Sequence, residues 1–416
     1  LVTHLYQFDG SNGGQNNTFI DSSSNNLTVT AGSDVPAQGT FSPFSADEGK
    51  WSVKFTRATP DYISPDSSSD FAFGTGDFTI ECWCYLTGGG ASGGNGLFAP
   101  TTGVVGPALG QWNTNGWQIY TGTSETNLSN TSYPQNEWVH VAFVRASNVV
   151  NLYQNGVKVT SDISDSTNYT NTGFNIGWYY GTAFAWDGYI SNFRIVKGTA
   201  VYTSNFDVPT EPLTAITNTK LLTCCSNRFR DKSTSAHSFT TASYPKIQPF
   251  SPFKNAAEYN PAVHGGSFLF EKNANSSLSV SHATLFDFGT ADYCIEAWLY
   301  PTQTSFSNSW AMWASTIGVN QYWAYTNGGG NQAAAGFSSY PAGGYSASNS
   351  HILKPFEWSH CVFQNTGGYE NWYLNGTQIY DVQNNPNHGS SATGMMFGRA
   401  NNYASYFYYG GYMSDV

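Results

Sequence analysis

The sequence FAFGTGDFTIECWCY at residues 71–85 returns as FDFGTADYCIEAWLY at residues 286–300. Nine of the 15 positions are identical, at an offset of 286 − 71 = 215 residues. Four shorter motifs recur in the same order: FSPF at 41–44 and 250–253, WVHVAF at 138–143 and WSHCVF at 358–363, Asn-Gly at 155–156 and 375–376, and DGYIS at 187–191 and GGYMS at 410–414. Because a solenoid repeat spans about 20–50 residues, this longer repeat predicts two copies of a whole domain.

The repeat also predicts the domain boundaries. Domain 1 is expected at residues 1–197, a Thr- and Pro-containing linker at 198–218, and domain 2 at 219–416, where Lys220–Leu222 corresponds to His4–Tyr6 as a first strand. Domain 1 continues from DGYIS into FRIVKG, whereas the second copy stops at Val416. We therefore expect a truncated closing strand in domain 2 and a natural polypeptide that continues beyond Val416, because an unfinished strand leaves sheet hydrogen bonds unmade.

The composition favours β-structure and excludes two kinds of partner. Charged residues make up 10% of the chain, against about 25% in an average domain, while 16% of the residues are aromatic and 43 are glycine. Such a chain suits sheets with long loops better than helices. The net charge is −11 and there is no basic stripe, so we expect no nucleic-acid partner. No apolar run reaches the about 18 residues of a membrane span, so we expect no membrane insertion.

The cysteines are predicted to be free thiols. A disulfide framework would recur with the domain, but none of the six cysteines has a cysteine at the equivalent place in the other copy. Cys82 and Cys84 lie within one predicted strand and lack a second pair at zinc spacing, which argues against a zinc site.

Alternating side chains predict strands over the conserved blocks. In residues 78–85, Phe78, Ile80, Cys82 and Cys84 share one face, while Thr79, Glu81, Trp83 and Tyr85 share the other. Residues 139–144 and 189–196 are two further predicted strands. The Asn-Gly pairs at 155–156 and 375–376 predict tight hairpins, because Asn-Gly favours a type I′ turn.

Taken in order, these motifs resemble those of laminin-G-like, concanavalin A-like lectin domains. The resemblance rests on the Asp-x-Ser turns at 21–23 and 231–233, the blocks quoted above, and the LYxNG hairpin, and it covers nearly the whole chain. It implies an all-β fold, two concanavalin A-like jelly-roll β-sandwiches in tandem. The linker GTAVYTSNFDVPTEPL and the FSPF element also resemble tandem domains in structural proteins of tailed, especially marine, bacteriophages.

That second resemblance implies a location and partners. A virion protein of this kind is assembled in the host cytoplasm and displayed on the virion surface. Its expected partners are other virion proteins, further copies of itself and cell-surface glycans.

The sequence offers no catalytic residues. Enzymes of this fold that cleave β-glucans carry carboxylates alternating on one strand as E-x-D-x-x-E, and retaining chemistry needs two carboxyl groups about 5 Å apart. Glu81 and Glu296 each stand alone between apolar neighbours, so we interpret them as partnered residues on a sheet face. His140 and His360 are interpreted as hydrogen-bonded strand histidines.

Calcium is the one cofactor that the resemblance implies. Many relatives bind it at the sandwich rim through loop oxygens, and Ca²⁺ takes six to eight hard oxygen ligands. Asp21 and Asp187 match that pattern in domain 1; Asp231 matches Asp21 in domain 2, where Gly410 replaces Asp187. The alternative for Asp21 and Asp231 is an Asx-turn, in which the carboxylate bonds its own backbone.

Aromatic side chains on predicted loops are candidates for stacking on sugar rings. They are Trp112, Trp117, Trp178, Tyr179, Tyr180 and Trp186 in domain 1, and Trp310, Trp313, Trp323 and Tyr406–Tyr409 in domain 2. Loops rich in amides and aromatics suit neutral glycans, but they equally suit polar protein interfaces or core packing.

Three functions remain open at this point. The first is a non-enzymatic virion protein, such as a tail fibre, tail or capsid-decorating component, whose lectin-like domains bind host glycans. The second is a purely structural virion module that binds only proteins. The third is a bacterial extracellular adhesin.

Overall fold

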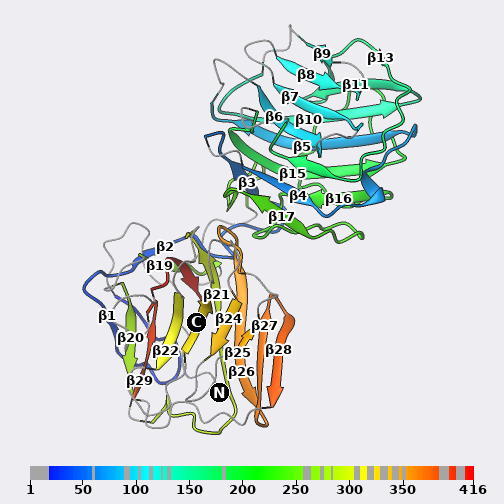
Figure 1. Ribbon diagram of the computed structural model, residues 1–416. Helices are drawn as coiled ribbons and strands as arrows, with labels where there is room; N and C mark the ends of the chain where they lie inside the picture. Colours follow the sequence, from blue (N-terminus) through cyan, green and yellow to red (C-terminus); the bar gives the residue numbers. More distant parts are fainter. Residues whose placement is uncertain are drawn as a thin grey trace. The chain divides into compact units, whose positions relative to one another are not determined.

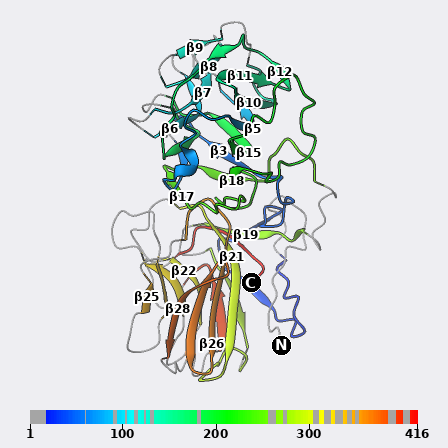
Figure 2. The same ribbon diagram turned by 90° about the vertical axis from the view of Figure 1, so that its right-hand side faces the viewer.

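The computed structural model is all-β. It describes the chain except for residues 1–17, 59–60, 89–93, 102–104, 112–115, 123–124, 129–132, 180–183, 256–263, 272–275, 283, 304–309, 316–322, 328–335, 340–345, 349–352, 384–392 and 400–407. The described part divides into two compact units: unit 1 combines residues up to Ser45 with Ala257–Val416, and unit 2 is Ala46–Ala256. Each unit is a sandwich of two antiparallel sheets, which Figures 1 and 2 show from two sides. The described residues contain no helix long and apolar enough to cross a membrane.

In unit 2 we name the sheets after β5 and β6. The β5 sheet has the order β12 (Val157–Lys158), β11 (Val149–Gln154), β10 (Trp138–Ala146), β5 (Phe78–Leu86), β15 (Gly188–Lys197), β3 (Ser52–Phe55) and β18 (Lys246–Gln248), with β13 (Ile163–Ser164) beside β11 and β16 (Thr219–Thr223) beside β15. The β6 sheet has the order β17 (Phe239–Ala242), β4 (Tyr62–Pro65), β14 (Phe174–Ile176), β6 (Asn95–Pro100), β7 (Ala108–Gln111), β8 (Trp117–Tyr120) and β9 (Glu125–Asn127). A 3-10 turn, η1 (Ser69–Phe71), follows β4.

Unit 1 repeats this order strand for strand. Its β21 sheet has the order β2 (Ala37–Gly39), β19 (Ser267–Phe270), β30 (Gly411–Ser414), β21 (Tyr293–Pro301), β26 (Ser359–Thr366), β27 (Tyr369–Leu374) and β28 (Thr377–Gln383). Its β22 sheet has the order β1 (Val29–Ala31), β20 (Leu278–Ser281), β29 (Gly394–Phe397), β22 (Trp310–Ser315), β23 (Trp323–Asn327), β24 (Gly336–Ser339) and β25 (Ser346–Ser348).

The strands predicted from the repeat are confirmed. β5 and β10 cover the predicted residues 78–85 and 139–144, and both faces of β5 are largely buried. Both Asn-Gly pairs lie in the left-handed region, at φ 47° and 75° for Asn155 and Gly156 and at 51° and 80° for Asn375 and Gly376. These are the angles that a type I′ turn requires.

Aromatic side chains fill the space between the sheets. In unit 2, Phe78 stacks on Phe73 at 4.5 Å between ring centroids, and Phe98 stacks on Phe174 at 5.5 Å. In unit 1, Trp313 meets Phe363 edge-on at 5.0 Å. The six cysteines are free; of these, Cys294 is exposed and the other five are buried.

The compact units do not follow the domain boundaries expected at 1–197 and 219–416. The strands β16, β17 and β18, expected to begin domain 2, pair with β15, β4 and β3 of unit 2. Conversely, β1 and β2 pair with β20 and β19 of unit 1. In Figure 1 the blue β1 accordingly lies beside β20, and the green β17 lies beside the blue β4.

The repeat itself explains how the compact units can differ from the expected boundaries. Each FSPF element packs on the same aromatic residues, but in the other copy. Phe41 contacts Tyr300, Trp358 and Tyr412 at 4.8–5.2 Å between ring centroids. Phe250 contacts their counterparts Tyr85, Trp138 and Tyr189 at 4.8–5.1 Å. The two FSPF elements are alike, and so are the aromatic residues on which they pack. Either element could therefore complete either sheet.

Candidate functional site

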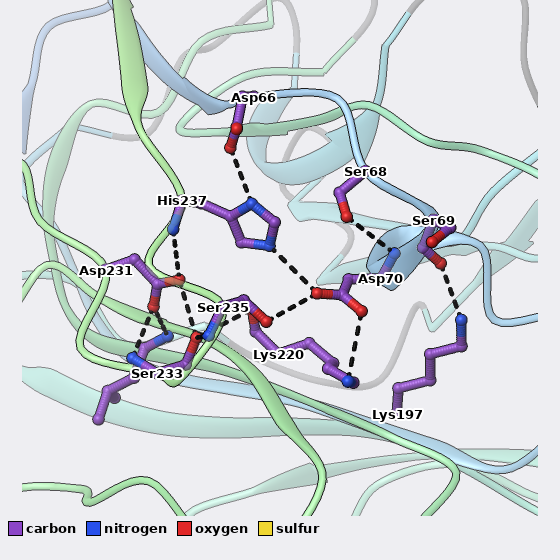
Figure 3. A network of polar contacts seen from close by, with 11 residues as sticks. Asp66, Ser68, Ser69, Asp70, Lys197, Lys220, Asp231, Ser233, Ser235 and His237 are labelled. Carbon is purple, nitrogen blue, oxygen red and sulfur yellow. Dashed lines mark hydrogen bonds and ion pairs between the residues drawn. The ribbon is translucent and has the colours of Figure 1, made fainter.

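A polar network joins η1 of unit 2 to the loop before β17 (Figure 3). His237 lies between two carboxylates: its Nδ1 is 2.8 Å from an Asp66 oxygen and its Nε2 is 3.4 Å from an Asp70 oxygen. The His237 ring also packs on Phe71, at 4.9 Å between centroids. The histidine therefore attaches a loop from the second half of the chain to a turn from the first half.

Asp70 is the centre of the network. It accepts a hydrogen bond from Ser235 Oγ at 2.7 Å and pairs with Lys220 Nζ at 3.3 Å. Partial burial alone would raise the pKa of Asp70, but the Ser235 and Lys220 hydrogen bonds and the charges of Lys220 and His237 bring it below its ordinary value. These contacts join protein groups to one another, so we interpret the network as a structural tie.

The carboxylates of the two Asp-x-Ser turns are occupied by their own loops. Asp231 accepts from the backbone N–H groups of Leu222, Ser233 and His237 at 2.8–3.0 Å and from Ser233 Oγ at 2.8 Å. Asp21 accepts from the backbone of Ser23 and Leu27 at 2.9 and 2.8 Å. This is the geometry of the Asx-turn alternative.

The third calcium candidate belongs to a different unit from the first. Asp187 lies in unit 2 and Asp21 in unit 1. Asp187 is half-buried, and its backbone carbonyl accepts from the N–H and the hydroxyl of Thr87, both at 2.9 Å. Within the described residues, no three His, Cys, Asp or Glu side chains gather around a common point. Calcium binding remains a prediction.

Glu81 is held by a buried network on the outer face of the β5 sheet. Arg194 donates to one of its oxygens from Nε at 2.9 Å and Nη2 at 2.6 Å. The other oxygen is 3.2 Å from His140 Nε2 and accepts from Tyr202 Oη at 2.9 Å. Burial would raise the pKa of Glu81, but the hydrogen bonds and the charges of His140 and Arg194 bring it below its ordinary value. The interpretation of Glu81 and His140 as partnered strand residues is confirmed.

Most of the described aromatic candidates belong to the core. Trp117, Trp186 and Trp313 are at most 1% exposed, and Tyr179 and Tyr409 are also buried. Trp117 donates from its ring to Gln154 at 2.8 Å. Trp178 is half-buried against Tyr62, at 5.4 Å between centroids, and Tyr408 is half-buried as well. Trp112, Tyr180, Tyr406 and Phe407 lie outside the described residues, as do the side chains of Trp310 and Trp323.

Tyr179 nevertheless lines a small hollow of about 10 Å³ on the β6 sheet. Its lining includes residues of three adjacent strands, Asn95 on β6, Gln111 on β7 and Gln118 on β8. The walls are Tyr179, Phe184 and glycines at 94, 96 and 110. A side chain at Gly96 would come within 2.4 Å of Tyr179 Cβ, and one at Gly110 within 2.9 Å of the Asn95 carbonyl. The glycines therefore let the strands and the wall approach each other closely.

Hydrogen bonds within the hollow orient its amides. Asn95 Nδ2 donates to Gln111 Oε1 at 2.7 Å, and Gln118 Nε2 donates to Glu125 at 3.3 Å. Asn95 Oδ1 is buried and accepts no hydrogen bond from the protein. Amides that both donate and accept, beside an aromatic wall, match the edges and faces of a sugar ring. This volume has room for about one water molecule and is far below the about 300–1,000 Å³ of drug-sized ligand pockets, so the hollow does not enclose a sugar ring.

Sequence reasoning placed Tyr179 among the candidates but missed Asn95, Gln111, Gln118 and Phe184. The three amides are spread over 24 residues (118 − 95 = 23 positions apart) in a chain rich in polar, uncharged residues. In the register of β7 and β8, Gln111 pairs with Trp117 and Gln118 pairs with Gly110. The side chains of Gln111 and Gln118 therefore point to opposite faces of the sheet, and no alternation in the sequence links them.

Comparison with known proteins agrees with the fold. Residues 57–200 match the concanavalin A-like lectin/glucanases superfamily. This stretch lies within unit 2 and includes the hollow. No curated protein sequence matches the chain.

Several solved structures are similar at low identity. A putative carbohydrate binding protein from Bacteroides ovatus is 18% identical over 48% of this chain and 60% of its own, with a TM-score of 0.37. Domains LG4-5 of the mouse laminin alpha1 chain are 10% identical over 87% of this chain and 86% of theirs, with a TM-score of 0.28. A carbohydrate binding module from Bacillus subtilis is 12% identical over 36% of this chain and 84% of its own, with a TM-score of 0.23. At TM-scores this low, the likeness does not extend to function.

Proposed function

We propose that the protein is a non-enzymatic adhesion and structural protein of a virion, and that the hollow of unit 2 binds a neutral glycan of the host surface. The observation that carries the glycan assignment is that amide and aromatic residues, Gln118, Tyr179 and Phe184 among them, line the hollow. Gln118 provides donors and an acceptor for hydroxyl groups, and Tyr179 and Phe184 provide apolar surface.

The lining chemistry favours a neutral ligand. None of the eight lining residues that the structure describes is basic, which favours a ligand without a carboxylate or sulfate. One small subsite binds weakly, and several copies on one particle would raise the overall avidity by about 10²–10⁴. The hollow itself contains no group that needs calcium; a rim calcium at Asp187 is a separate prediction.

A non-enzymatic role follows from the state of the carboxylates. Hydrolysis of a glycoside by retention needs two carboxyl groups about 5 Å apart. Glu81 is committed to Arg194, His140 and Tyr202, and the hollow is lined by amides rather than acids.

The virion setting is supported by the linker and FSPF sequences, which resemble those of tailed-phage structural proteins. The expected partners are other virion proteins and further copies of the chain, at the particle surface. Immunogold labelling of purified particles tests this location; labelling confined to the host cell envelope would favour a bacterial adhesin instead.

A neutral-glycan array, read with and without a chelator, tests the binding site. We expect a signal from the purified chain and a roughly tenfold loss of affinity in Gln118→Ala, the cost of about one hydrogen bond. Gln248→Ala on β18 is the control, since that glutamine does not line the hollow. If no sugar binds while the protein stays on purified virions, only the structural role remains.

A further inference from the structure

Each unit is completed by a segment with the same local structure. In unit 2, β17 pairs with β4, with Thr240 opposite Ser64; in unit 1, β1 pairs with β20, with Thr30 opposite Ser279. The two pairings match residue for residue, at offsets of 240 − 30 = 210 and 279 − 64 = 215 residues. We call the two completing stretches the first segment, residues 18–31, and the second segment, residues 219–242.

The loops before the two strands are also alike. In each loop, the carboxylate of the Asp-x-Ser turn accepts from the backbone N–H six residues further on, which is that of His237 at 3.0 Å in unit 2 and that of Leu27 at 2.8 Å in unit 1. The N–H groups of Ser235 and Asn25 each donate to the serine hydroxyl of the same turn at 3.2 Å. His237 therefore corresponds to Leu27, and Ser235 corresponds to Asn25.

In unit 2, these positions carry the polar network of Figure 3. His237 lies 2.8 Å from Asp66 and 3.4 Å from Asp70, and Ser235 donates to Asp70 at 2.7 Å. Lys220 pairs with the other oxygen of Asp70 at 3.3 Å. The second segment thus supplies the histidine, the serine and the lysine, while β4 and η1 of unit 2 supply the two acids.

In unit 1, the corresponding positions carry uncharged side chains. Leu27 stands in the place of the histidine, and Ser281 and Leu285 stand in the places of the two acids. Leu27 and Leu285 both pack against the core cluster that includes Phe286, the counterpart of Phe71. Unit 1 and its segment therefore match each other by apolar contact, where unit 2 and its segment match by charge.

The two pairings are not interchangeable. In a simple tandem the two segments would exchange places, and Leu27 would then lie beside Asp66 and Asp70. The Asp70 side chain is only 23% exposed, so it would lose its protein partners without gaining full contact with water. His237 would in turn face Leu285 instead of an acid. Because an unsatisfied charged group costs more than an unsatisfied neutral one, both mixed pairings are less stable than the observed ones.

We infer that Asp66 and Asp70 form a selective docking site for the second segment, and that their pairing with His237 and Ser235 decides which segment completes unit 2. The aromatic contacts of the FSPF elements are alike in both units and cannot make this choice. The polar network can make it, because its two halves differ between the units. The exchanged path that results crosses between the units twice, near residues 45 and 256, whereas a simple tandem crosses once.

Three introduced cysteines report which segment completes unit 2. The full chain carries Ser64→Cys on β4, Thr240→Cys on the second segment and Thr30→Cys at the equivalent position of the first segment. Directly opposite residues have Cα atoms about 4.5–5.5 Å apart, within the range of a disulfide. The chain is refolded from urea under reducing conditions and then oxidised with glutathione disulfide. Mass spectrometry of the monomer should show at least tenfold more of the 64–240 disulfide than of the 64–30 disulfide.

The first set of substitutions exchanges the selecting residues of the two segments. It combines Asn25→Ser and Leu27→His with Ser235→Asn and His237→Leu. The ratio of the 64–30 to the 64–240 disulfide should rise at least tenfold, because the partners of the two acids now lie on the first segment. The matched control exchanges another pair of equivalent loop residues, at φ 46° and 51°, which lie outside the network: Asn26→Ala with Ala236→Asn. This control should leave the ratio unchanged.

The second set moves the two acids from unit 2 to unit 1: Asp66→Ser and Asp70→Leu with Ser281→Asp and Leu285→Asp. It should favour the 64–30 disulfide in the same way. A chain that carries both sets has matched pairs again, now with the charges in unit 1, and should return to the 64–240 disulfide.

The combined chain also covers the case of a single set that does not fold. If one set alone prevents folding and the combined chain folds with the 64–240 disulfide, the pairing is required and the inference holds. It is overturned if the chain without either set forms mainly the 64–30 disulfide, or if a folded single set leaves the ratio unchanged. It is also overturned if the control shifts the ratio as much as the first set, or if the combined chain does not restore the 64–240 disulfide.

Discussion

At the scale of single residues, equivalent side chains have acquired different energetic roles. Glu81 and Glu296 share a sequence context, a histidine partner and a strand position. Glu81 is buried and bonded to Arg194, while Glu296 is largely exposed. A buried ion pair loses much when one partner is removed, because the other charge is left uncompensated. An exposed pair contributes little.

Glu81→Gln should therefore destabilise the protein by about 3–5 kcal/mol, while the matched variant Glu296→Gln should stay within about 1 kcal/mol of the wild type. Urea denaturation followed by tryptophan fluorescence measures both. Equal effects of the two substitutions would contradict the structural difference between the units.

The same residue predicts a pH dependence. The folded protein holds the pKa of Glu81 below its ordinary value of 4.5, so its contribution is fully present above about pH 4.5. It is lost as the pH falls through the lower, folded-state pKa, because the unfolded state then binds the proton more readily. The stability gap between wild type and Glu81→Gln should thus shrink in acid. A gap that widens on acidification would show that burial, rather than the Arg194 and His140 contacts, dominates.

At the scale of elements, the hairpins and central strands could be predicted because their signals are local. Asn-Gly at 155–156 favours a tight turn by itself, and the alternation in residues 78–85 determines which side chains share a face. Residues 198–206, which we call the strap, cross the outer face of the β5 sheet, where Thr79 Oγ1 donates to the Thr199 carbonyl and accepts from the Val201 N–H. The strap could not be predicted, because it has no amphipathic period and is ordered by the face that it covers. The hollow could not be predicted either, because its amides come from three strands. Trp117 and Trp186, interpreted as loop residues, pack in the core instead.

The two Asn-Gly hairpins allow a test of the strap. Gly156→Ala and Gly376→Ala both place alanine at a positive φ, which costs about 1–2 kcal/mol. At Gly156 a Cβ would also lie 2.0 Å from the Phe206 carbonyl of the strap, whereas at Gly376 nothing lies within 4 Å. Gly156→Ala should therefore be the more destabilising by a further 1–3 kcal/mol or so, of the size found for overpacking. Thermal melts compare the two, and hydrogen exchange in residues 198–206 should rise only in Gly156→Ala. Indistinguishable variants would place the strap away from the turn.

At the scale of the whole molecule, the repeat specifies a scaffold, and the path of the chain decides which segments complete it. Unit 2 takes its last strands from residues that the sequence assigns to the second repeat, and unit 1 takes β1 and β2 from the first. A comparison of the shared motifs of the two repeats in sequence cannot distinguish this exchange of strands from a simple tandem, because the contacts of these motifs are the same in both arrangements. The family match at residues 57–200 covers strands that stay in unit 2 in both arrangements.

Substitutions in the two FSPF elements distinguish the exchange of strands from a simple tandem. Phe250→Ala removes ring contacts with Tyr85, Trp138 and Tyr189, and Phe41→Ala removes contacts with Tyr300, Trp358 and Tyr412. Since an aromatic pair contributes about 0.5–1.5 kcal/mol beyond area burial, each substitution should loosen one sandwich by about 1–3 kcal/mol. Hydrogen exchange followed by mass spectrometry reports each sandwich separately. Phe250→Ala should speed exchange in β5, residues 78–86, and leave β21, residues 293–301, unchanged; Phe41→Ala should do the reverse. The opposite assignment, with Phe41→Ala loosening β5, would show that each sandwich is completed by its own repeat and that the exchanged path is wrong.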